Sequence, residues 1–519
     1  MSQPHVIVIG GGINGAAIAR DAARRGLRVT VFEKNDFGCG TSWSSSKLIH
    51  GGLRYLEHFH LNLVRSSLRE RNWLLHTYPH NTRWLPFVVP VYRHSPHSRW
   101  VLKAGLKLYQ YLDSSHNDFD SMDAESLLAH IPGLSSEGLR GGFVYQDGHC
   151  LFPERLVLDN LKDAVNHGAS IHNHHKVLQF EPSGSRIAAV RVRDELTGTE
   201  SEHPCDFVVN AAGPWIDGLI GGLGAKSPLS LGFRGSHLVF KNNELQLRHA
   251  IYTPARSDGR PFFIIPWLNF VLVGTTEVQE DGSASDTVPS AKEVDYLIKE
   301  INYCLPDTHW KQEDAVLSFS GIRSLIFKPG SSLNALSREM GLYDHTRDGY
   351  ENILTLIGGK LTTFRETAES VVNRMVTSQS WHAGLCQTYE PLAFGEGSDR
   401  YSGLLNEESL DRLKTLYGGQ TKAVVDLIRS DSSLGKRLSE GVPDLAAQVV
   451  YAVKEEWAGT VADVLLRRTG AALEPNAGKP AAAEVAAIMQ PLLGWDDSRM
   501  QAEIQNYKRL VDKTLLSHR

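Results

Sequence analysis

Short apolar runs open the chain at strand and helix spacing. Val6–Ile9 is a continuous apolar run, typical of a strand that is buried on both faces. A helical pattern follows over residues 16–25, Gly26 ends it, and residues 27–32 form a second apolar run. This order predicts a strand, a helix and a second strand of one parallel sheet.

The same patterning divides the rest of the chain into larger units. Residues 226–335 alternate β-branched and aromatic runs with turns, which predicts an antiparallel sheet, and residues 401–519 are mostly helical in pattern. The predicted fold class is α/β: a Rossmann-like nucleotide-binding domain, an antiparallel-sheet substrate domain and an all-helical C-terminal domain. The expected boundaries are 1–80 plus 140–225 plus 340–376 for the nucleotide domain, 81–139 for a cap or membrane-facing segment, 226–339 for the substrate domain and 400–519 for the helical domain.

Composition narrows the class of protein. The 519 residues are 41% hydrophobic and 22% charged, as in ordinary globular proteins. The net charge of −5 gives no support for nucleic-acid binding, and no nucleic-acid partner is expected. No apolar run reaches the roughly 18–20 residues that span a bilayer, and a core strand at the start leaves no room for a signal peptide. Five scattered cysteines indicate a reducing, cytoplasmic compartment.

A glycine motif follows the first strand. Gly10, Gly12 and Gly15 have the G-x-G-x-x-G spacing, which permits a tight turn, close approach of a pyrophosphate, and packing of the next helix on the strand. Glu33 lies about 20 residues later, where an acid binds a ribose hydroxyl. The motif alone does not separate NAD from FAD. Its position at the N-terminus favours a flavoprotein.

Two other patterns leave alternatives open. His172, His174 and His175 lie close together, but no carboxylate or cysteine is arranged to complete a site, so no metal is expected. A second pattern, over residues 99–112, combines basic residues with an apolar stripe, which suits either an anionic membrane surface or an ordinary helix with its stripe in the core. Its residues are Arg99, Lys103 and Lys107, with Trp100, Leu102, Leu106, Tyr109 and Leu112.

Several segments, in order and over about the whole chain, resemble the FAD-dependent, quinone-reducing glycerol-3-phosphate dehydrogenases. They are Val6–Gly15, Thr41–Glu57, Asn210–Trp215, Gly235–His237, Ile265–Trp267, Gly274–Thr276, Phe319–Arg323, Ser337–Arg338, Gly358–Thr363, Glu455–Glu456 and Asp463–Arg468. The chain departs from the family's usual aspartate at Glu277, from its proline at Ser324, and around residues 391–398. The departures concern substrate detail and leave the flavin chemistry in place.

The resemblance implies a fold like glutathione reductase and the amino-acid oxidases, with FAD as the cofactor. It implies oxidation of sn-glycerol 3-phosphate to dihydroxyacetone phosphate, with hydride transfer from C2 to flavin N5 and electrons passed to a membrane quinone. It also implies peripheral attachment to an anionic surface, the inner face of the cytoplasmic membrane, and leaves a homodimer open. The alternatives are a related polyol-phosphate dehydrogenase acting on erythritol phosphate, a peroxide-forming oxidase, and a non-catalytic flavin-binding regulatory protein.

The resemblance also implies roles for individual side chains. Arg323 and Arg338 are expected to hold the phosphate, since guanidinium groups bind phosphate with two parallel hydrogen bonds. Arg54 is expected close to the substrate oxygens or the phosphate, and Tyr55 is expected to hydrogen-bond the substrate. The predicted catalytic residues are His237 as general base, Arg54 and Lys360, with His50 as the second candidate base.

Other residues of these segments are expected to bind the flavin. Lys360 would lie near both substrate and flavin and stabilise the charge of the reduced ring. The predicted cofactor residues are Gly10, Gly12, Asn14, Gly15, Glu33, Thr41, Ser42, Ser46, Lys47, Leu48, His50, Gly51, Gly213, Gly359, Leu361 and Thr362.

Overall fold

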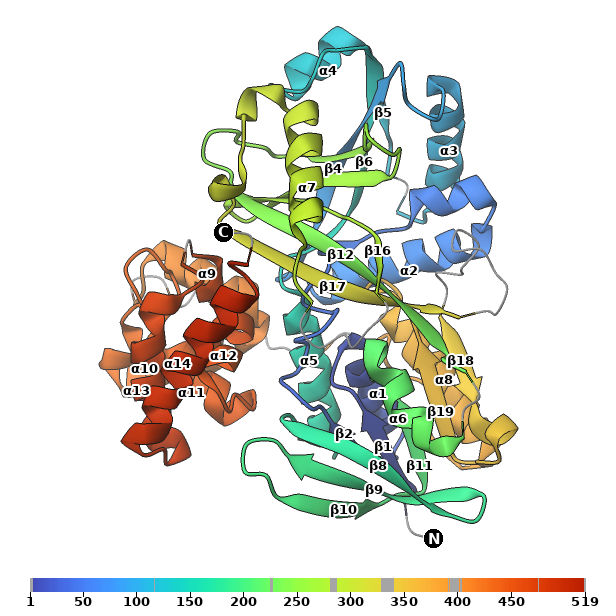
Figure 1. Cartoon of the computed structure of the whole chain (residues 1–519), viewed down its shortest axis with the longest axis vertical. Coiled ribbons are helices and arrows are strands. Elements are labelled where there is room, and N and C mark those ends of the chain that lie inside the picture. Colours follow the sequence, from blue (N-terminus) through green and yellow to red (C-terminus); the bar gives the residue numbers. More distant parts are fainter. Residues whose placement is uncertain are drawn as a thin grey trace.

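The protein contains two large sheets, a small three-stranded sheet, helices that pack on the sheets, and a separate group of helices at the C-terminal end (Figure 1). The computed structural model describes residues 3–115, 117–224, 227–280, 287–327, 340–390, 392, 401, 404–474 and 476–517. The helices are α1 (Ile13–Arg24), α2 (Leu61–Thr77), α3 (Arg99–Leu112), α4 (Ala124–His130), α5 (Pro153–Asn166), α6 (Ile216–Ile220), α7 (Ala291–Cys304), α8 (Phe364–Ser378), α9 (Glu407–Tyr417), α10 (Thr421–Ser430), α11 (Ala446–Glu455), α12 (Val461–Asp463), α13 (Ala482–Leu493) and α14 (Asp497–Lys513).

The first sheet is the predicted Rossmann-like unit. Its strand order is β18 (Gly341–Asp344), β19 (Ile353–Ile357), β11 (Phe207–Asn210), β1 (His5–Ile9), β2 (Arg28–Phe32) and β7 (Ser170–His172). All pairs except β18–β19 are parallel. The chain leaves β1 towards β2 on one side and later returns to β11 on the other, which makes the carboxyl end of β1 a topological switch point, where such sheets bind ligands.

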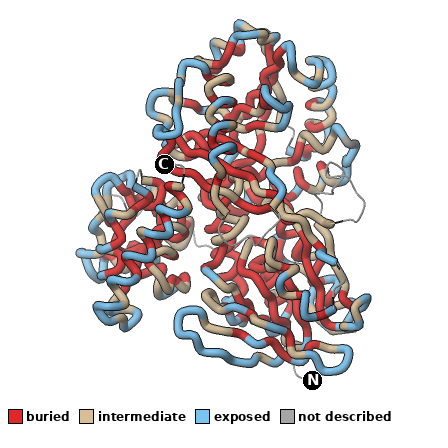
Figure 2. The backbone as a smooth tube through the Cα atoms, viewed as in Figure 1, coloured by how far each residue is buried: buried red, intermediate tan, exposed pale blue. Residues whose placement is uncertain are grey.

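Both faces of this sheet are covered, which explains the uninterrupted apolar runs. Val6 and Val8 pack on one face with α1, α5 and α8, whereas Ile7 and Ile9 pack on the other. That second face is covered by α6 and by a three-stranded sheet of β8 (His175–Ser183), β9 (Arg186–Asp194) and β10 (Glu200–Pro204). Figure 2 shows the buried strands, with the outer strands exposed along one side.

The second sheet has ten strands and is mostly antiparallel. Its strands are β16 (Val278–Glu280), β12 (Ser230–Lys241), β15 (Phe270–Gly274), β14 (Pro261–Trp267), β13 (Ala250–Pro254), β4 (Thr82–Tyr92), β6 (Leu139–Cys150) and β3 (Leu48–Ile49), with β17 (Leu317–Ile326) beside β12 and β5 (Asp120–Met122) beside β6. The predicted separation of residues 81–139 from the substrate domain differs from this arrangement, because β4 pairs with β6 and β13. The predicted boundary at residue 140 falls inside β6.

Helix α3 lies at the edge of the molecule, beside α2 (Figure 1). Of the predicted apolar stripe, Leu106 and Tyr109 are buried, so this stripe packs on the core. Another face is open to solvent: Trp100 is 79% exposed and Tyr111 is 83% exposed. None of the helices in the described residues is long and apolar enough to cross a bilayer.

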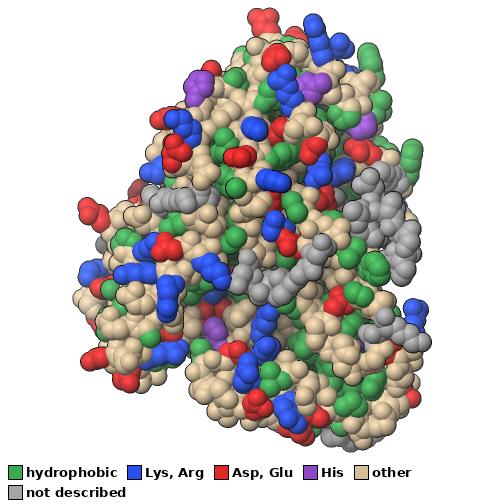
Figure 3. Space-filling view, in the orientation of Figure 1, with side chains coloured by type: hydrophobic (Ala, Val, Ile, Leu, Met, Phe, Trp, Pro, Cys, Tyr) green, Lys and Arg blue, Asp and Glu red, His purple; other side chains and the backbone are tan. Residues whose placement is uncertain are grey.

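The helices of the C-terminal domain, α9–α14, pack together beside α5 (Figure 1). A π-helical turn, Val464–Arg468, follows α12 and also contacts α5. The last residues return to the second sheet, where the amide of Ser318 donates to the carbonyl of Leu515. On the face shown in Figure 3, acidic and basic side chains are interspersed without a continuous field of one sign.

Candidate active site

A cavity of about 1330 Å³ is lined by residues of both large sheets. It begins at the carboxyl end of β1 and reaches β12, β14 and β17 of the second sheet. Pockets for single small molecules enclose about 300–1,000 Å³. This cavity therefore has room for a dinucleotide and a small substrate together.

Glycines form the end of the cavity at β1. A Cβ atom on Gly10 would lie 2.6 Å from the carbonyl oxygen of Ala211, and one on Gly15 would lie 1.9 Å from the carbonyl oxygen of Gly10. A side chain on Gly10 would clash with the residues that follow β11, and one on Gly15 would push α1 away from the turn. The N-terminus of α1 consequently lies close to the turn, with its amides available to a pyrophosphate.

Glu33 lies at the end of β2 and belongs to this same corner. Its carboxylate accepts hydrogen bonds from the amides of Gly11, at 2.7 Å, and Asn35, at 2.9 Å. Burial raises the pKa of Glu33, and these two amides act in the opposite direction. The hydrogen bond to Gly11 fixes the Glu33 carboxylate against the glycine loop.

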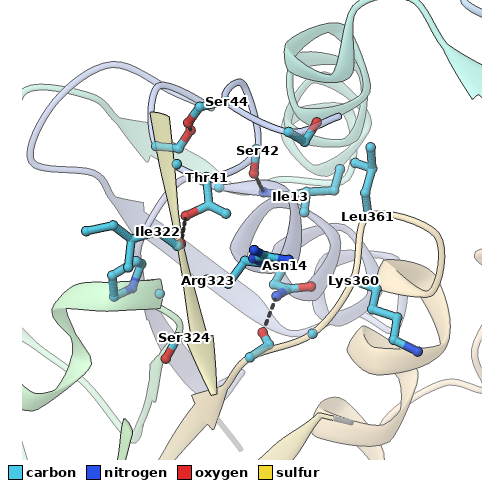
Figure 4. Close-up of a pocket in the computed structure, with 18 of the residues that line it drawn as sticks. Ile13, Asn14, Thr41, Ser42, Ser44, Ile322, Arg323, Ser324, Lys360 and Leu361 are labelled. Atoms are coloured by element: carbon cyan, nitrogen blue, oxygen red, sulfur yellow. Dashed lines mark hydrogen bonds between the residues drawn. The ribbon is translucent and has the colours of Figure 1, made fainter. Parts of the chain in front are cut away.

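The segment after Gly40 joins the two sheets. Thr41 Oγ1 donates to the carbonyl oxygen of Ile322 on β17, at 2.6 Å, and Ser42 Oγ accepts from the amide of Ile13, at 3.0 Å (Figure 4). Ser42 thus provides an acceptor at the N-terminus of α1, where the helix has no side-chain cap of its own. Two hydroxyl groups predicted to contact the cofactor are therefore held in place, one by β17 of the second sheet and one by α1.

His237, the predicted base, lies on β12 and lines the cavity. Its Nε2 is 2.9 Å from Ser46 Oγ, its ring stacks on Phe319, and its Nδ1 has no hydrogen-bond partner among the described residues. Burial, Arg323 and Lys47 lower the pKa of His237 to about 3. The imidazole is consequently neutral at pH 7 in the protein without ligand, and able to accept a proton.

Three predicted cationic residues line the same cavity as His237: Arg54, Arg323 and Lys360. Arg323 donates to the carbonyl oxygen of Thr276, at 3.2 Å. The Nζ atom of Lys360 lies 3.9 Å from the ring centre of Tyr55. The Tyr55 ring packs over Gly52, and the backbone of Gly52 has a left-handed conformation that only glycine adopts easily. Positive charge from three distant segments is thereby collected around one cavity.

Arg260 is a further cation of the cavity, and no motif in the sequence points to it. It lies just before β14 and donates to the carbonyl oxygen of Glu277, at 2.8 Å. It stands alone in a polar turn, so no spacing or motif distinguishes it from a surface arginine. Glu277 and Ser324, where the chain departs from the family pattern, line this cavity too.

Three of the predicted cofactor residues do not line the cavity: Gly15, Lys47 and Gly51. Gly15 lies outside the cavity wall, where it allows α1 to pack closely against the glycine turn. The Lys47 side chain is buried, donates to the carbonyl oxygen of Trp43 at 3.1 Å and lies over the ring of Trp267. Gly51 faces Leu68 and Tyr109, with no room for a Cβ atom.

The structure brings the other described residues of the predicted set together in one place. Those that line the cavity are Gly10, Gly12, Asn14, Glu33, Thr41, Ser42, Ser46, Leu48, His50, Arg54, Tyr55, Gly213, His237, Arg323, Gly359, Lys360, Leu361 and Thr362. The remaining predicted phosphate ligand, Arg338, lies outside the described residues.

Buried polar atoms facing the cavity provide a test of whether a polar cofactor fits. Asn14 Oδ1, Trp215 Nε1 and Ser324 Oγ are buried without a hydrogen-bond partner among the described residues, and all three residues line the cavity. Buried polar atoms ordinarily have partners. Donors and acceptors of this kind, together with the glycine turn and Glu33, fit FAD.

The sequence predicted no carboxylate beside the histidines near residue 174, but the structure places one there. His174 Nε2 is 2.9 Å from Asp463 Oδ2, and Asp36 lies close to both. Arg467 contacts both carboxylates, and Arg468 also pairs with Asp36. The guanidinium groups therefore already supply the positive charge that a metal ion would bring.

Comparison with known families defines the class of protein. A family model described as FAD dependent oxidoreductase matches residues 5–365, and one described as the C-terminal domain of alpha-glycerophosphate oxidase matches residues 354–500. The first match alone covers more than half of the chain. It includes the glycine turn, Glu33 and all the predicted site residues that line the cavity. The protein is an FAD-dependent oxidoreductase.

Similar proteins narrow this class further. A Synechocystis glycerol-3-phosphate dehydrogenase is 36% identical, over 98% of this chain and 97% of its own, and a Pseudomonas aeruginosa glycerol-3-phosphate dehydrogenase is 34% identical, over 91% and 93%. The solved structure of the Bacillus halodurans glycerol-3-phosphate dehydrogenase complexed with FAD has a TM-score of 0.78 and 26% identity, covering 99% and 95%. The chain belongs to the glycerol-3-phosphate dehydrogenase family.

Proposed function

We propose that this protein oxidises sn-glycerol 3-phosphate to dihydroxyacetone phosphate with FAD and passes the electrons to a membrane quinone. The observation that carries the proposal is the meeting of Arg54, Arg323 and Lys360 with the neutral imidazole of His237 in one cavity. The full-length likeness to proteins named glycerol-3-phosphate dehydrogenase supports the same substrate. FAD, when bound, accepts the hydride that leaves C2 of the substrate.

Different residues of the chain are proposed to bind the phosphate and to stabilise developing charge. Arg323 binds the substrate phosphate, with Arg54 and Arg338 as further predicted donors, because guanidinium groups match the geometry of phosphate oxygens. Lys360 adds a compact positive charge where negative charge develops. These charges favour a phosphorylated polyol over a neutral one.

His237 is proposed to take the proton of the C2 hydroxyl. A pKa of about 3 makes the imidazole a weak base in the protein without ligand, and a base is most effective when its pKa is near the working pH. A bound phosphate dianion would offset the charge of Arg323, which is one cause of the low value. Substrate binding would thereby raise the pKa of His237 and strengthen the base.

The quinone and membrane parts of the proposal depend on surface features. The 3₁₀ helix η1, Leu53–His58, contributes Arg54 and Tyr55 to the cavity, and Phe59 directly after it is 83% exposed. This helix contacts α3, whose Trp100 and Tyr111 are also exposed. An apolar surface next to the wall of the cavity suits peripheral attachment to the inner face of the cytoplasmic membrane and access for a quinone.

The test is anaerobic stopped-flow absorbance of the bound flavin. Wild-type protein is mixed in parallel with glycerol 3-phosphate, glycerol and erythritol 4-phosphate, and we expect rapid bleaching with glycerol 3-phosphate only. Bleaching by erythritol 4-phosphate instead would favour the related polyol-phosphate dehydrogenase. Absence of bleaching with all three compounds would favour a non-catalytic flavin protein.

The same experiment tests the phosphate assignment. Arg323→Ala should lower the second-order rate constant of flavin reduction about 10- to 150-fold, because a hydrogen bond to a charged group contributes about 1.5–3 kcal/mol. Arg256→Ala, a half-exposed arginine of the β13–β14 turn that does not line the cavity, is the matched control. Equal rates for the two variants would contradict the assignment. Hydrogen peroxide formed in air at the rate of turnover would identify an oxidase.

A further inference from the structure

A buried ion-pair cluster joins the C-terminal domain to the nucleotide domain. Asp36, three residues after the ribose-binding Glu33, pairs with Arg467 and with Arg468, which binds it through two nitrogens, at 2.7 and 2.8 Å. The Asp36 and Arg468 side chains are fully buried. Both arginines come from the π-helical turn after α12, more than 430 residues along the chain.

Asp36 is ionised in this environment. Burial by itself would raise its pKa, but Arg468 and Arg467 outweigh burial and hold the pKa well below the ordinary value. A third donor, the side-chain amide of Asn173, contributes a hydrogen bond at 3.0 Å and also donates to the carbonyl oxygen of Trp457. Loss of one member would leave an uncompensated charge in the interior, which is strongly destabilising.

The segment that carries Asp36 holds the glycine loop from both sides. On one side, Glu33 accepts the amide hydrogen of Gly11, and on the other, the amide of Gly38 donates to the carbonyl oxygen of Gly11, at 2.9 Å. The ring of Phe37 fills the space beside Gly11, where a Cβ atom would lie 2.4 Å from it. The position of the Gly11 peptide therefore depends on residues 33–38.

The C-terminal domain contacts this segment at a second point. The ring of Phe37 meets the ring of Trp457 edge to face, with centres 5.9 Å apart. Trp457 lies next to Glu456, which pairs with Arg155 of α5 through two hydrogen bonds, at 2.7 and 2.8 Å. The contacts from Arg467, Arg468 and Trp457 thus act on Asp36 and Phe37, which lie between Glu33 and Gly38, the two residues that bind the Gly11 peptide.

We propose that the C-terminal helical domain positions the FAD-binding loop, with Arg467 and Arg468 acting through Asp36 and Trp457 acting through Phe37. These are positioning residues, because none of the five lines the cavity. The domain fixes segment 33–38, and this segment holds the Gly11 peptide and the Glu33 carboxylate in the geometry that binds the pyrophosphate and ribose of FAD. The proposal concerns the cofactor and holds whichever polyol phosphate is oxidised.

The experiment measures FAD and ADP binding to the full-length apoprotein, by fluorescence and calorimetry. Arg468→Met and Asp36→Asn should each raise the FAD Kd at least tenfold and weaken ADP binding in parallel. The double variant should raise the Kd by much less than the product of the single effects, because the two residues act as one unit. The matched control is Arg412→Met, which breaks a partly buried pair with Asp444 inside the C-terminal domain and should leave the FAD Kd within twofold.

A role limited to joining the domains predicts a different pattern. In that case Arg468→Met would lower Tm as Arg412→Met does, with the FAD Kd within twofold of wild type, and the proposal would be overturned. Weaker FAD binding with unchanged ADP binding would also overturn it, because the effect would then arise at the flavin end. If Arg468→Met does not fold, Trp457→Leu replaces it, with an expected rise of at least threefold in the rate of FAD release from the holoprotein.

Discussion

His237 illustrates how one residue combines opposing influences. It lies opposite Gly274 of the neighbouring strand β15, where a Cβ atom would lie 2.4 Å from its ring, so the packing of the buried imidazole depends on this glycine. The same burial leaves Nδ1 without a partner among the described residues. Its chemistry is therefore set by the packing of three neighbouring strands, β12, β15 and β17.

His237→Ala should slow flavin reduction by glycerol 3-phosphate about 10²- to 10⁴-fold, which is the usual contribution of a general base. Since the pKa in the free protein is about 3, kcat/KM of the wild type should show no break from His237 between pH 5 and 8. The comparison is His50→Ala, measured by stopped flow over that pH range. A larger loss for His50→Ala than for His237→Ala would assign the base to His50.

Single residues also show what the sequence can reveal. The spacing of Gly10, Gly15 and Glu33 is local, and each residue type has a geometric reason to be there, so the sequence predicts the tight turn that the structure contains. Arg260 was missed because nothing in its neighbours distinguishes it. Lys47 lies in a segment that resembles the family, yet its side chain points into the core. A motif does not predict the direction of a side chain, because that direction depends on tertiary packing.

Among the elements, α3 presents two apolar faces with different environments. The basic and apolar pattern of residues 99–112 left two alternatives, and the structure places Leu106 and Tyr109 in the core. Three apolar residues of α3 are exposed: Trp100, Val101 and Tyr111. Of these, only Trp100, at the end of the stripe, belonged to the predicted pattern. Periodicity identified the helix, but the partner of each face is decided by tertiary packing.

A membrane role for α3 predicts that its exposed aromatic residues are required for binding. The double variant Trp100→Ser/Tyr111→Ser should bind vesicles containing anionic lipid at least tenfold more weakly, because each side chain loses about 1.5–3 kcal/mol of apolar burial. The control is Leu385→Ser, which removes an 85% exposed apolar residue from another part of the surface. Sedimentation with vesicles measures the difference, and equal binding by the two variants would exclude this face as the anchor.

At the scale of the whole molecule, the contacts between domains join residues far apart in the chain. The helical C-terminal domain was predicted from its pattern, but its attachment was not, because no local pattern pairs Asp36 with Arg467 or His174 with Asp463. The second sheet crosses the predicted boundaries for the same reason: β4 pairs with β13, which begins more than 100 residues later in the chain.

His174 should make the attachment of the domains depend on pH. Burial and Arg467 lower its pKa, but the hydrogen bond to Asp463 and the charges of Asp463 and Asp36 prevail, so the pKa is raised above 6.5. The stabilising effect of the protonated ring is therefore fully present below pH 6.5 and is lost as pH rises through the higher pKa of the folded protein.

Calorimetry can measure this effect. His174→Gln should lower Tm relative to wild type at pH 6, and the difference should shrink as pH rises to 8.5. The control variant is His382→Gln, at an exposed histidine. A difference in Tm between His174→Gln and wild type that stays constant over this range would exclude titration of His174 as the cause.

The pairing of Asp36 with Arg467 and Arg468 also has a consequence for biosynthesis. During translation, the glycine loop and β2 leave the ribosome first, whereas the two arginines emerge only after some 430 further residues. Until then the Asp36 carboxylate lacks the cations that it meets in the folded protein. If these arginines position the loop as proposed, stable cofactor insertion is a late event, and chains that end before the π-helical turn should emerge from the ribosome with their nucleotide strands formed but without retained flavin.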